Sequence, residues 1–404
     1  MRAIRQLHKL GKIRKELKEI YLNQVIQTFA LSLIGIFIPI YLLNLGFNMN
    51  SVLIFMVVQW SILAFIAPVS AKLSSSIGLK HTILLRMPVL MLYIFLLMFI
   101  GNLSMGFLFI IAILGGMSLC LYWVPLNAEF VKNTDQLHIG QEIGFMMALP
   151  RIAGIFAPFI GGAILELFGF NPLFILVLVL IIISVIPLFM SADYRSAFRF
   201  SIKDTKISIK RNFSGVYFIY GMLHMGETLV WPVFIFVMLS DILVVGAAAS
   251  ITAIGISFFT VLIGKVSDRI YKRKLLIMGA IGYSLVWFSR VFSASLIDVL
   301  LLSFMGGLFD SLVHISLFSQ FCDEARKENI LAHVSSREFW LGIGRIAPLM
   351  LVIFFSVQSL FTVMFVSTGL LCLGLMVFKS EYDIRQSIMF SPTRKRKIRT
   401  GMNN

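Results

Sequence analysis

Long apolar segments divide the basic residues of this sequence into two sets, and no other feature constrains the fold as strongly. Hydropathy gives twelve apolar segments of about 20 residues, the length that a helix needs to cross the hydrocarbon core of a bilayer. When the stretches outside them are numbered from the N-terminus, the odd ones hold nearly all of the 35 basic residues and the even ones hold none. Loops rich in lysine and arginine stay on the cytoplasmic side. The sequence therefore predicts a multi-pass protein of the cell membrane, inner or cytoplasmic, with both termini in the cytoplasm.

The predicted spans cover residues 20–43, 51–70, 82–101, 105–127, 142–167, 172–190, 214–239, 244–263, 275–296, 299–321, 338–357 and 360–378. Arg86, close to the beginning of the third span, is counted with the basic loop that precedes it. Three basic residues then remain inside spans, namely Arg151, Arg290 and Arg345.

The composition excludes several classes of protein. Hydrophobic residues make up 59% of the chain and charged residues 13%, whereas about 25% of an average soluble protein is charged. The net charge of +16 comes from residues that flank apolar spans, which predicts contact with anionic lipid headgroups and not with nucleic acid. Cys120, Cys322 and Cys372 are too few and too scattered for a disulfide framework or a metal cluster, so no metal or cofactor is expected. Residues 1–19 lack the apolar core of a cleavable signal and are expected to form a cytoplasmic surface helix.

The two halves of the chain are similar to each other. Four landmarks recur at a separation of 191 to 194 residues: Pro39 and Pro232, Lys72–Ser74 and Lys265–Ser267, Gly115-Gly116 and Gly306-Gly307, and Arg151 and Arg345. A parallel repeat of six spans predicts an all-α polytopic membrane protein with 12 transmembrane helices in two pseudo-symmetric six-helix bundles. The expected division is 1–190 for an N-terminal segment and bundle, 191–213 for a cytoplasmic linker, 214–380 for the second bundle and 381–404 for a basic cytoplasmic tail that lies on lipid.

A basic loop in the second half carries a family resemblance. The residues from Gly264 to Lys274 read Gly-Lys-Val-Ser-Asp-Arg-Ile-Tyr-Lys-Arg-Lys, which resembles the cytoplasmic signature of the major facilitator superfamily, with a tyrosine in place of its second glycine. The equivalent loop of the first half keeps few of these residues. The resemblance implies a cytoplasmic latch that involves Gly264, Asp268 and Arg269, with Glu142 at the start of span 142–167 as the partner. The alternative is an ordinary basic turn.

The span 142–167 carries a second resemblance. Gly144, Pro158, Gly161 and Gly162 match the antiporter signature of the same superfamily, in which small residues line one helix face. Small residues allow helices to approach closely, and a proline bends a helix. The resemblance favours export of a drug or metabolite, although tight helix packing alone explains the same residues.

Five charged residues are predicted inside the membrane: Arg151, Glu227, Arg290, Asp310 and Arg345. Each costs about 2.5–3.5 kcal/mol at a helix centre, so each must be paired, hydrated or neutralised. Arg290 is near the outer end of its span and is expected to extend to the headgroups. Glu227 and Asp310 are the predicted proton-coupling residues, because a buried acid is titratable. Arg151 and Arg345 stand at equivalent points of the two halves. Each could bind solute or take part in proton coupling, or could only link neighbouring helices, and the sequence leaves these alternatives open.

Polar and aromatic residues share single faces of the spans that line the central cavity in the family that the chain resembles. Their spacing of three or four residues places them on one side of each helix. The predicted substrate-binding residues are Asn23, Gln27, Tyr122, Trp123, Arg151, Tyr220, His224, Trp231, His314 and Arg345. For the histidines, a hydrogen bond to a neighbouring helix is the alternative, and for the aromatic residues it is packing.

These observations predict a secondary active transporter that moves a small organic solute by alternating access, with export coupled to protons. The alternative is proton-coupled uptake of a sugar or an organic acid. No enzyme is expected, because the close pair Asp310 and His314 sits too deep for an aqueous active site. A non-transporting receptor is disfavoured, because the sequence leaves no room for a sizeable soluble domain. The expected partners are the solute, protons and lipids, and the protein is expected to be a monomer.

Overall fold

The computed structural model describes residues 15–102, 105–133, 148–189, 200–211, 214–267, 272–327, 329–354 and 357–377. All regular secondary structure in these ranges is helical. Within these ranges, each predicted span coincides with a helix or with two or three helical pieces in series. The prediction of an all-α polytopic membrane protein is therefore confirmed.

The first half contains six such spans. The first consists of α2 (Lys15–Ser32), the short turn η2 (Gly35–Phe37) and α3 (Ile38–Asn44). The next three are α4 (Met49–Ile77), α5 (Leu79–Phe99) and α6 (Met105–Asn133). The last two are residues 148–154 continued by α8 (Ala157–Phe168), and α9 (Phe170–Val185) with η4 (Ile186–Phe189).

The second half follows α10 (Ile202–Arg211), a short helix outside the spans. Its first span is α11 (Ser214–Met225), the π-helical turn η5 (Gly226–Val230) and α12 (Trp231–Leu239). The others are α13 (Ile242–Ser267), α14 (Lys272–Arg290), α15 (Leu296–Ala325), α16 (Ile330–Phe354) and α17 (Val357–Gly374). Of the helices that the structure describes, nine are long and apolar enough to cross a bilayer by composition alone. Helices α14 and α16 carry several charged residues, and α17 contributes a shorter apolar stretch, Phe361–Gly374.

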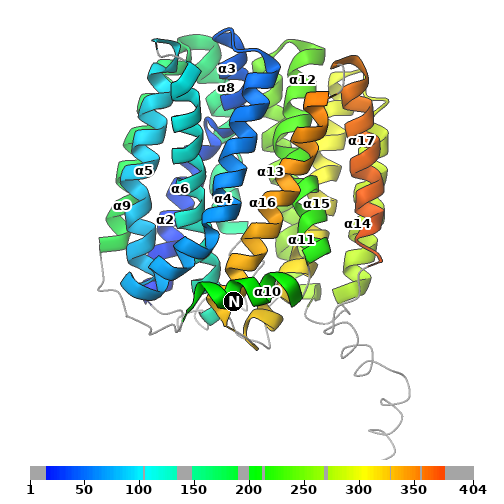
Figure 1. Ribbon diagram of the computed structural model, residues 1–404. Coiled ribbons are helices and arrows are strands. Elements are labelled where there is room, and N and C mark those ends of the chain that lie inside the picture. Colours follow the sequence, from blue (N-terminus) through cyan, green and yellow to red (C-terminus); the bar gives the residue numbers. More distant parts are fainter. Residues whose placement is uncertain are drawn as a thin grey trace, which may run out of the picture.

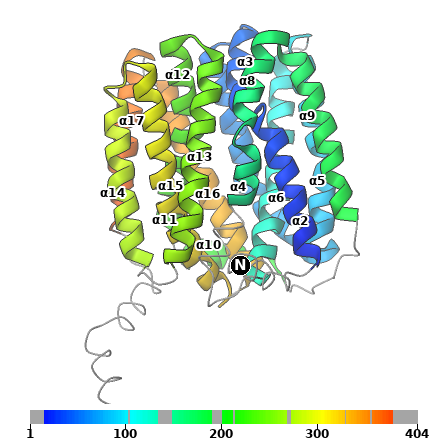
Figure 2. The ribbon, with the colours of Figure 1, turned by 180° about the vertical axis from the view of Figure 1, so that it is seen from behind.

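The helices stand side by side with their axes nearly parallel, the first half on the left of Figure 1 and the second half on the right, and Figure 2 shows the same division from behind. Between the halves, α16 packs on α4 and α13 packs on α8. Glycines allow the close approach: a Cβ atom on Gly342 would lie 2.6 Å from the Cβ of Ala64, and one on Gly246 would lie 2.5 Å from the carbonyl oxygen of Pro158. The seam between the halves is therefore built mainly from these two helix pairs, and α16 also packs on α6.

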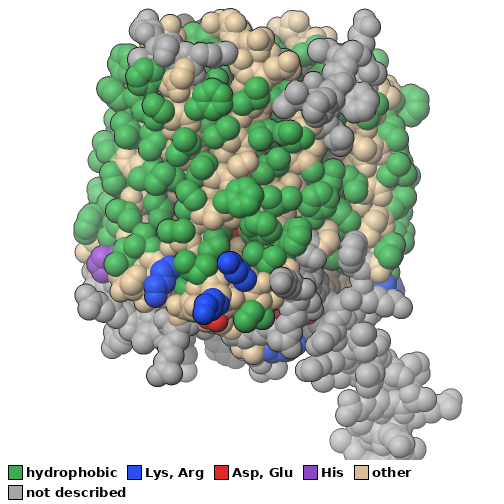
Figure 3. All heavy atoms as spheres, viewed as in Figure 1, with side chains coloured by type: hydrophobic (Ala, Val, Ile, Leu, Met, Phe, Trp, Pro, Cys, Tyr) green, Lys and Arg blue, Asp and Glu red, His purple; other side chains and the backbone are tan. Residues whose placement is uncertain are grey.

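The surface separates apolar and basic side chains along the helix axes. Large exposed hydrophobic residues such as Phe65, Leu167 and Leu285 cover the outer faces of the helices. Figure 3 shows hydrophobic side chains over most of the visible face and lysine and arginine near its lower end, where α10 lies across the helix ends in Figure 1. Lys203 and Lys206 of α10 are exposed there. This distribution is typical of a bundle surrounded by lipid with one basic end.

Candidate functional site

A buried arginine in the first half is held by neutral groups. Arg86 of α5 is 1% exposed, and its Nε donates a hydrogen bond to the hydroxyl of Ser118 at 3.1 Å. Its Nη1 donates to Oε1 of Gln27, and its guanidinium lies 4.1 Å from the ring centroid of Tyr122. These four residues, from α2, α5 and α6, form what we call the Arg86 cluster. Among the described residues, no carboxylate pairs with this guanidinium.

A buried arginine in the second half has an acid as its partner. Arg290, at the end of α14, is 0% exposed and makes a two-pronged ion pair with Glu227, with Nη1–Oε2 at 2.7 Å and Nη2–Oε1 at 3.0 Å. The hydroxyl of Tyr283 donates to the same carboxylate at 3.2 Å. The guanidinium lies between the rings of Trp231 and Trp287, at 4.3 and 4.1 Å from their centroids. The charge of Arg290 is thus neutralised inside the protein.

Local backbone features make room for this pair. Glu227 lies in the π-helical turn η5, where one extra residue per turn changes the direction of the side chain. Gly306 of α15 lies beside the pair, and a Cβ atom there would be 2.8 Å from Nη2 of Arg290. The indole Nε1 of Trp231 donates to the hydroxyl of Ser303 at 2.9 Å. The predicted extension of Arg290 to the headgroups is wrong, because the chain supplies a carboxylate for it.

A cavity of about 480 Å³ lies between the two halves. Its polar lining includes Gln27, Arg86 and Arg151 on the side of the first half and Glu227 and Thr228 on the other. Its apolar and aromatic lining includes Leu31, Tyr122, Trp123, Trp231 and Ile235. A volume of this size, mostly apolar with a few polar groups, is typical of a site for a small organic molecule.

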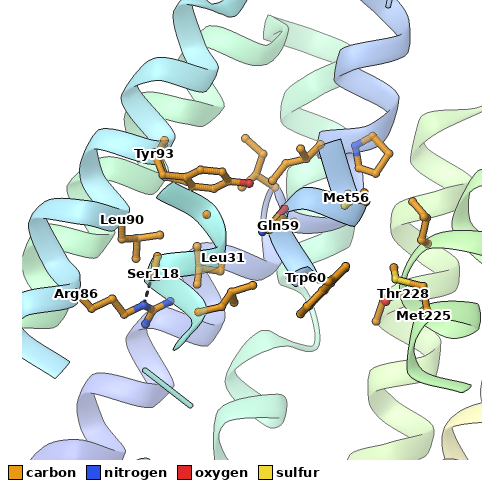
Figure 4. A pocket seen from close by; sticks show the side chains of 18 residues that line it. Leu31, Met56, Gln59, Trp60, Arg86, Leu90, Tyr93, Ser118, Met225 and Thr228 are labelled. Atoms are coloured by element: carbon orange, nitrogen blue, oxygen red, sulfur yellow. Dashed lines mark hydrogen bonds between the residues drawn. The ribbon is translucent and has the colours of Figure 1, made fainter. Parts of the chain in front are cut away.

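A second cavity of about 210 Å³ adjoins the first, and the two share Arg86, Leu31, Gly35, Leu119 and Thr228 in their linings. In Figure 4 the side chain of Arg86 points inward from its helix toward Ser118, and Gln59, Trp60 and Tyr93 lie along the wall of this cavity. Arg86 therefore stands at the boundary between two hollow regions, although the sequence analysis counted it with the basic loop before its span. It lies about two turns inside α5, so that count was wrong.

A third group of polar residues joins α11, α15 and α16 near the seam. The hydroxyl of Tyr220 donates to Oδ1 of Asp310 at 3.4 Å, and the ring of Tyr220 lies 5.5 Å from that of His314. His224 and Arg345 complete this group, and Trp60 of α4 contacts both. The centroid of the Trp60 ring is 6.3 Å from that of the His224 ring and 4.3 Å from the guanidinium carbon of Arg345. Nε and Nη1 of Arg345 are buried and have no hydrogen-bond partner in the described structure. This group contains Asp310 as an acid without a basic partner within ion-pair distance among the described residues.

The structure thus separates the predicted substrate-binding residues. Gln27, Tyr122, Trp123, Arg151 and Trp231 line the larger cavity. Tyr220, His224, His314 and Arg345 belong to the group around Asp310 and Trp60. Asn23 is 0% exposed and donates through its Nδ2 to the carbonyl of Ser184 at 2.7 Å, a contact that links α2 to α9.

The predicted latch residues Asp268, Arg269 and Glu142 lie outside the described residues, as does Gly144, while Gly264 lies within α13. Other polar contacts join the two halves at the end where α10 lies. The amide of Asn127 donates to Oε1 of Glu338 at 3.1 Å, and Nε of Arg326 donates to the carbonyl of Val131 at 2.9 Å.

The remaining residues of the span that contains Gly144 have clear positions. Pro158 stands at the start of α8, just after the helix is interrupted at residues 155–156. Gly161 contacts the backbone of Leu33, and Gly162 lies against Ile242 and Leu243, so both are at close helix contacts.

Comparison with known proteins gives one family and one fold. Residues 216–395 match the family model described as Major Facilitator Superfamily. The crystal structure of the human organic anion transporter MFSD10 (TETRAN) is similar, with a TM-score of 0.65 and 13% sequence identity over 90% of this chain and 99% of that chain. No curated protein sequence matches.

Proposed function

We propose that this chain is a membrane transporter of the major facilitator superfamily, whose family model matches residues 216–395, and that it exports a small organic solute in exchange for protons. The observation that carries the proposal is the cavity of about 480 Å³, which both halves line and which holds charged side chains within an apolar wall. A site at the interface of two six-helix halves becomes accessible from either side when the halves tilt. Alternating access then moves the solute across the membrane.

For proton coupling we favour Asp310 over Glu227. Both oxygens of Glu227 accept hydrogen bonds from Arg290, so a proton on this acid would have to break an ion pair. Asp310 has only the hydroxyl of Tyr220 at 3.4 Å as a hydrogen-bond partner, so its protonation disrupts no ion pair within the described structure. Arg151 lies within electrostatic reach of Asp310, and its movement between two conformations would change the affinity of the acid for a proton.

Export is the proposed direction because Pro158, Gly161 and Gly162 match the antiporter signature and stand at close helix contacts in α8. The apolar and aromatic lining suits an amphiphilic solute. The similar human protein is described as an organic anion transporter, so organic anions belong among the solutes to be tested.

The charge distribution supports the topology of this proposal. In this proposal the basic end that carries α10 faces the cytoplasm, both termini are cytoplasmic as the sequence predicts, and the protein resides in the cell membrane as a monomer. In this arrangement the halves 1–190 and 214–380 move as two bundles, joined by the linker 191–213, and the tail 381–404 lies on the anionic lipid surface.

A flux assay in proteoliposomes tests the function. Vesicles are preloaded with one of two permanently charged probes and diluted into acidic medium. The probes are the anion naphthalene-2-sulfonate and the cation 2-naphthyltrimethylammonium. Exchange with protons should release a preloaded probe faster than at equal pH, and Asp310→Asn should abolish the acceleration. Asp241→Asn is the matched control, because Asp241 is exposed and an asparagine still accepts from the amides of Leu243 and Val244. If the same proton gradient drives uptake of an external probe instead, the protein is a symporter and not an exporter. If the release rate of both probes is independent of the external pH, proton coupling is contradicted.

A further inference from the structure

We propose that the transported solute is an organic anion whose charged group binds between Arg86 and Arg151 in the cavity of about 480 Å³. This inference rests on the proposed function, because it names the class of solute that the transporter carries. The remaining steps concern the charges around the cavity, the orientation of Arg86 and the shape of the apolar wall.

The cavity lining carries more positive than negative charge that is free to act on a solute. Among the described residues that line it, the charged ones are Arg86, Arg151 and Glu227. The Glu227 carboxylate is already neutralised by Arg290 through two hydrogen bonds of 2.7 and 3.0 Å. Neither Arg86 nor Arg151 has an ion-pair partner among the described residues. The cavity therefore presents two guanidinium groups and no uncompensated carboxylate.

Uncompensated buried charge is unfavourable, which makes an anion the natural occupant. A buried basic side chain inside a membrane protein is usually paired with an acid, with backbone carbonyls or with a ligand. Nη1 of Arg151 is buried and has no hydrogen-bond partner, although the residue lines the cavity. An anion placed at this point would satisfy that donor and balance positive charge in the cavity lining. A cationic solute would add a further positive charge to the same lining.

The orientation of Arg86 is set before any solute arrives. Ser118 and Gln27 accept hydrogen bonds from Nε and Nη1, and the ring of Tyr122 supports the guanidinium at 4.1 Å. All three partners are neutral, so they position the group without cancelling its charge. Figure 4, which draws the smaller cavity of about 210 Å³, shows the side chain extended from its helix toward Ser118. A preorganised guanidinium of this kind binds carboxylate, sulfonate or phosphate groups well, because its planar donors match their oxygens.

The rest of the cavity describes the body of the solute. Leu31, Leu119, Trp123, Trp231 and Ile235 provide an apolar and aromatic surface next to the two arginines. An anion with an aromatic or aliphatic body would bury that body against these side chains while its head reached the guanidinium groups. A small inorganic anion such as chloride would leave the apolar surface unused.

The decisive measurement is equilibrium binding of the same two probes to the full-length protein in nanodiscs, each in the presence of chloride. Naphthalene-2-sulfonate should bind at least tenfold more tightly than 2-naphthyltrimethylammonium to the unaltered protein. Arg86→Gln and Arg151→Gln should each weaken sulfonate binding by roughly 10- to 100-fold, since a charge-assisted hydrogen bond is lost. Arg86→Lys should retain part of the affinity. The control is Lys206→Gln, which removes the same charge from an exposed position on α10 and should leave binding unchanged.

Two results would overturn the inference. One is equal or tighter binding of the cationic probe to the unaltered protein, a comparison that no folding defect can affect. The other is sulfonate binding that neither arginine substitution weakens in variants that keep the unfolding temperature of the parent. The proposed function and this inference can fail separately. Proton-driven flux of the cation alone would overturn the inference that the solute is an anion and would still support proton-coupled transport. Arg86-dependent sulfonate binding without proton-driven flux would support the anion site and contradict proton-coupled transport.

Discussion

Two buried arginines, one in each half of the molecule, use aromatic rings in the same way and differ in how their charge is balanced. Arg86 lies 4.1 Å from the ring of Tyr122, and Arg290 lies 4.1 Å from the ring of Trp287. Arg290 has the carboxylate of Glu227 as its partner, while Arg86 has the neutral oxygens of Gln27 and Ser118. The comparison teaches that a buried charge paired with an acid can stabilise the fold, whereas a buried charge with neutral partners remains available to bind a ligand.

The largest effect should come from breaking the pair. Glu227→Gln leaves Arg290 buried without a counter-charge, so we expect a loss of about 3–5 kcal/mol in the free energy of unfolding. Arg290→Gln should cost a similar amount, and the double variant should cost less than the sum, because neither charge is then left alone. Unfolding midpoints in detergent for the four proteins give this double-mutant cycle. Additive losses would show that the two residues do not stabilise each other.

Crowding the pair should have the next largest effect. In Gly306→Ala the new Cβ would lie 2.8 Å from Nη2 of Arg290 and 3.5 Å from Oε1 of Glu227, so the ion pair must shift. We expect about 1–3 kcal/mol of destabilisation, the usual cost of an overpacked interior. Gly35→Ala is the control, because no atom lies within 4 Å of its added Cβ. A result in which both alanine variants unfold at the same temperature would contradict the tight fit at Gly306.

The hydrogen bond that orients Trp231 should contribute an amount of the same order. Ser303→Ala removes the acceptor of the indole Nε1 at 2.9 Å, and a buried donor without a partner costs about 1–3 kcal/mol. The control is Ser311→Ala, whose hydroxyl donates only to the carbonyl of Leu308 in its own helix. Unfolding midpoints of both variants test the prediction. If Ser303→Ala is no less stable than Ser311→Ala, the indole has found another acceptor and its position over Arg290 does not depend on Ser303.

The smallest effect on stability should come from Arg86. Arg86→Gln removes hydrogen bonds but also removes a buried charge that no acid balances, so the two contributions offset each other and the change should stay below about 1 kcal/mol. The contrast with Arg290→Gln on the same unfolding assay is the sharpest test of the comparison. A loss as large as that of Arg290→Gln would mean that Arg86, too, is neutralised within the fold.

Sequence reasoning predicted the helices and five residues that line the larger cavity. The spans are confirmed as helices, because the apolar length needed to cross a bilayer is visible in any stretch of about 20 residues. Gln27, Tyr122, Trp123, Arg151 and Trp231 were predicted to bind the solute, and they line one cavity. That role stays a prediction. These residues were grouped because of the similarity between the two halves and because helical spacing places polar and aromatic residues on one face of a span.

Sequence reasoning failed where the partner of a charge lay on another helix. Arg290 was placed at the headgroups because it is near the outer end of its predicted span, yet Glu227, 63 positions earlier in the chain, binds it inside the protein. Arg86 was counted with the basic loop that precedes its span, and its buried position in α5 was missed. The apolar residues on both sides of it, 83–85 and 87–92, were the signal that could have revealed it.

The sequence by itself determined the number, order and length of the crossings and the location of the basic segments between them. These properties follow from hydrophobic transfer and loop charge, which are local and accumulate along the chain. Only the tertiary structure decided that Glu227 neutralises Arg290 and that Arg86 faces a cavity with neutral partners. Such pairings depend on the rotation and separation of helices that are distant in sequence. Moving a side chain by one position along a helix points it in another direction, which is enough to separate a charged group from its partner.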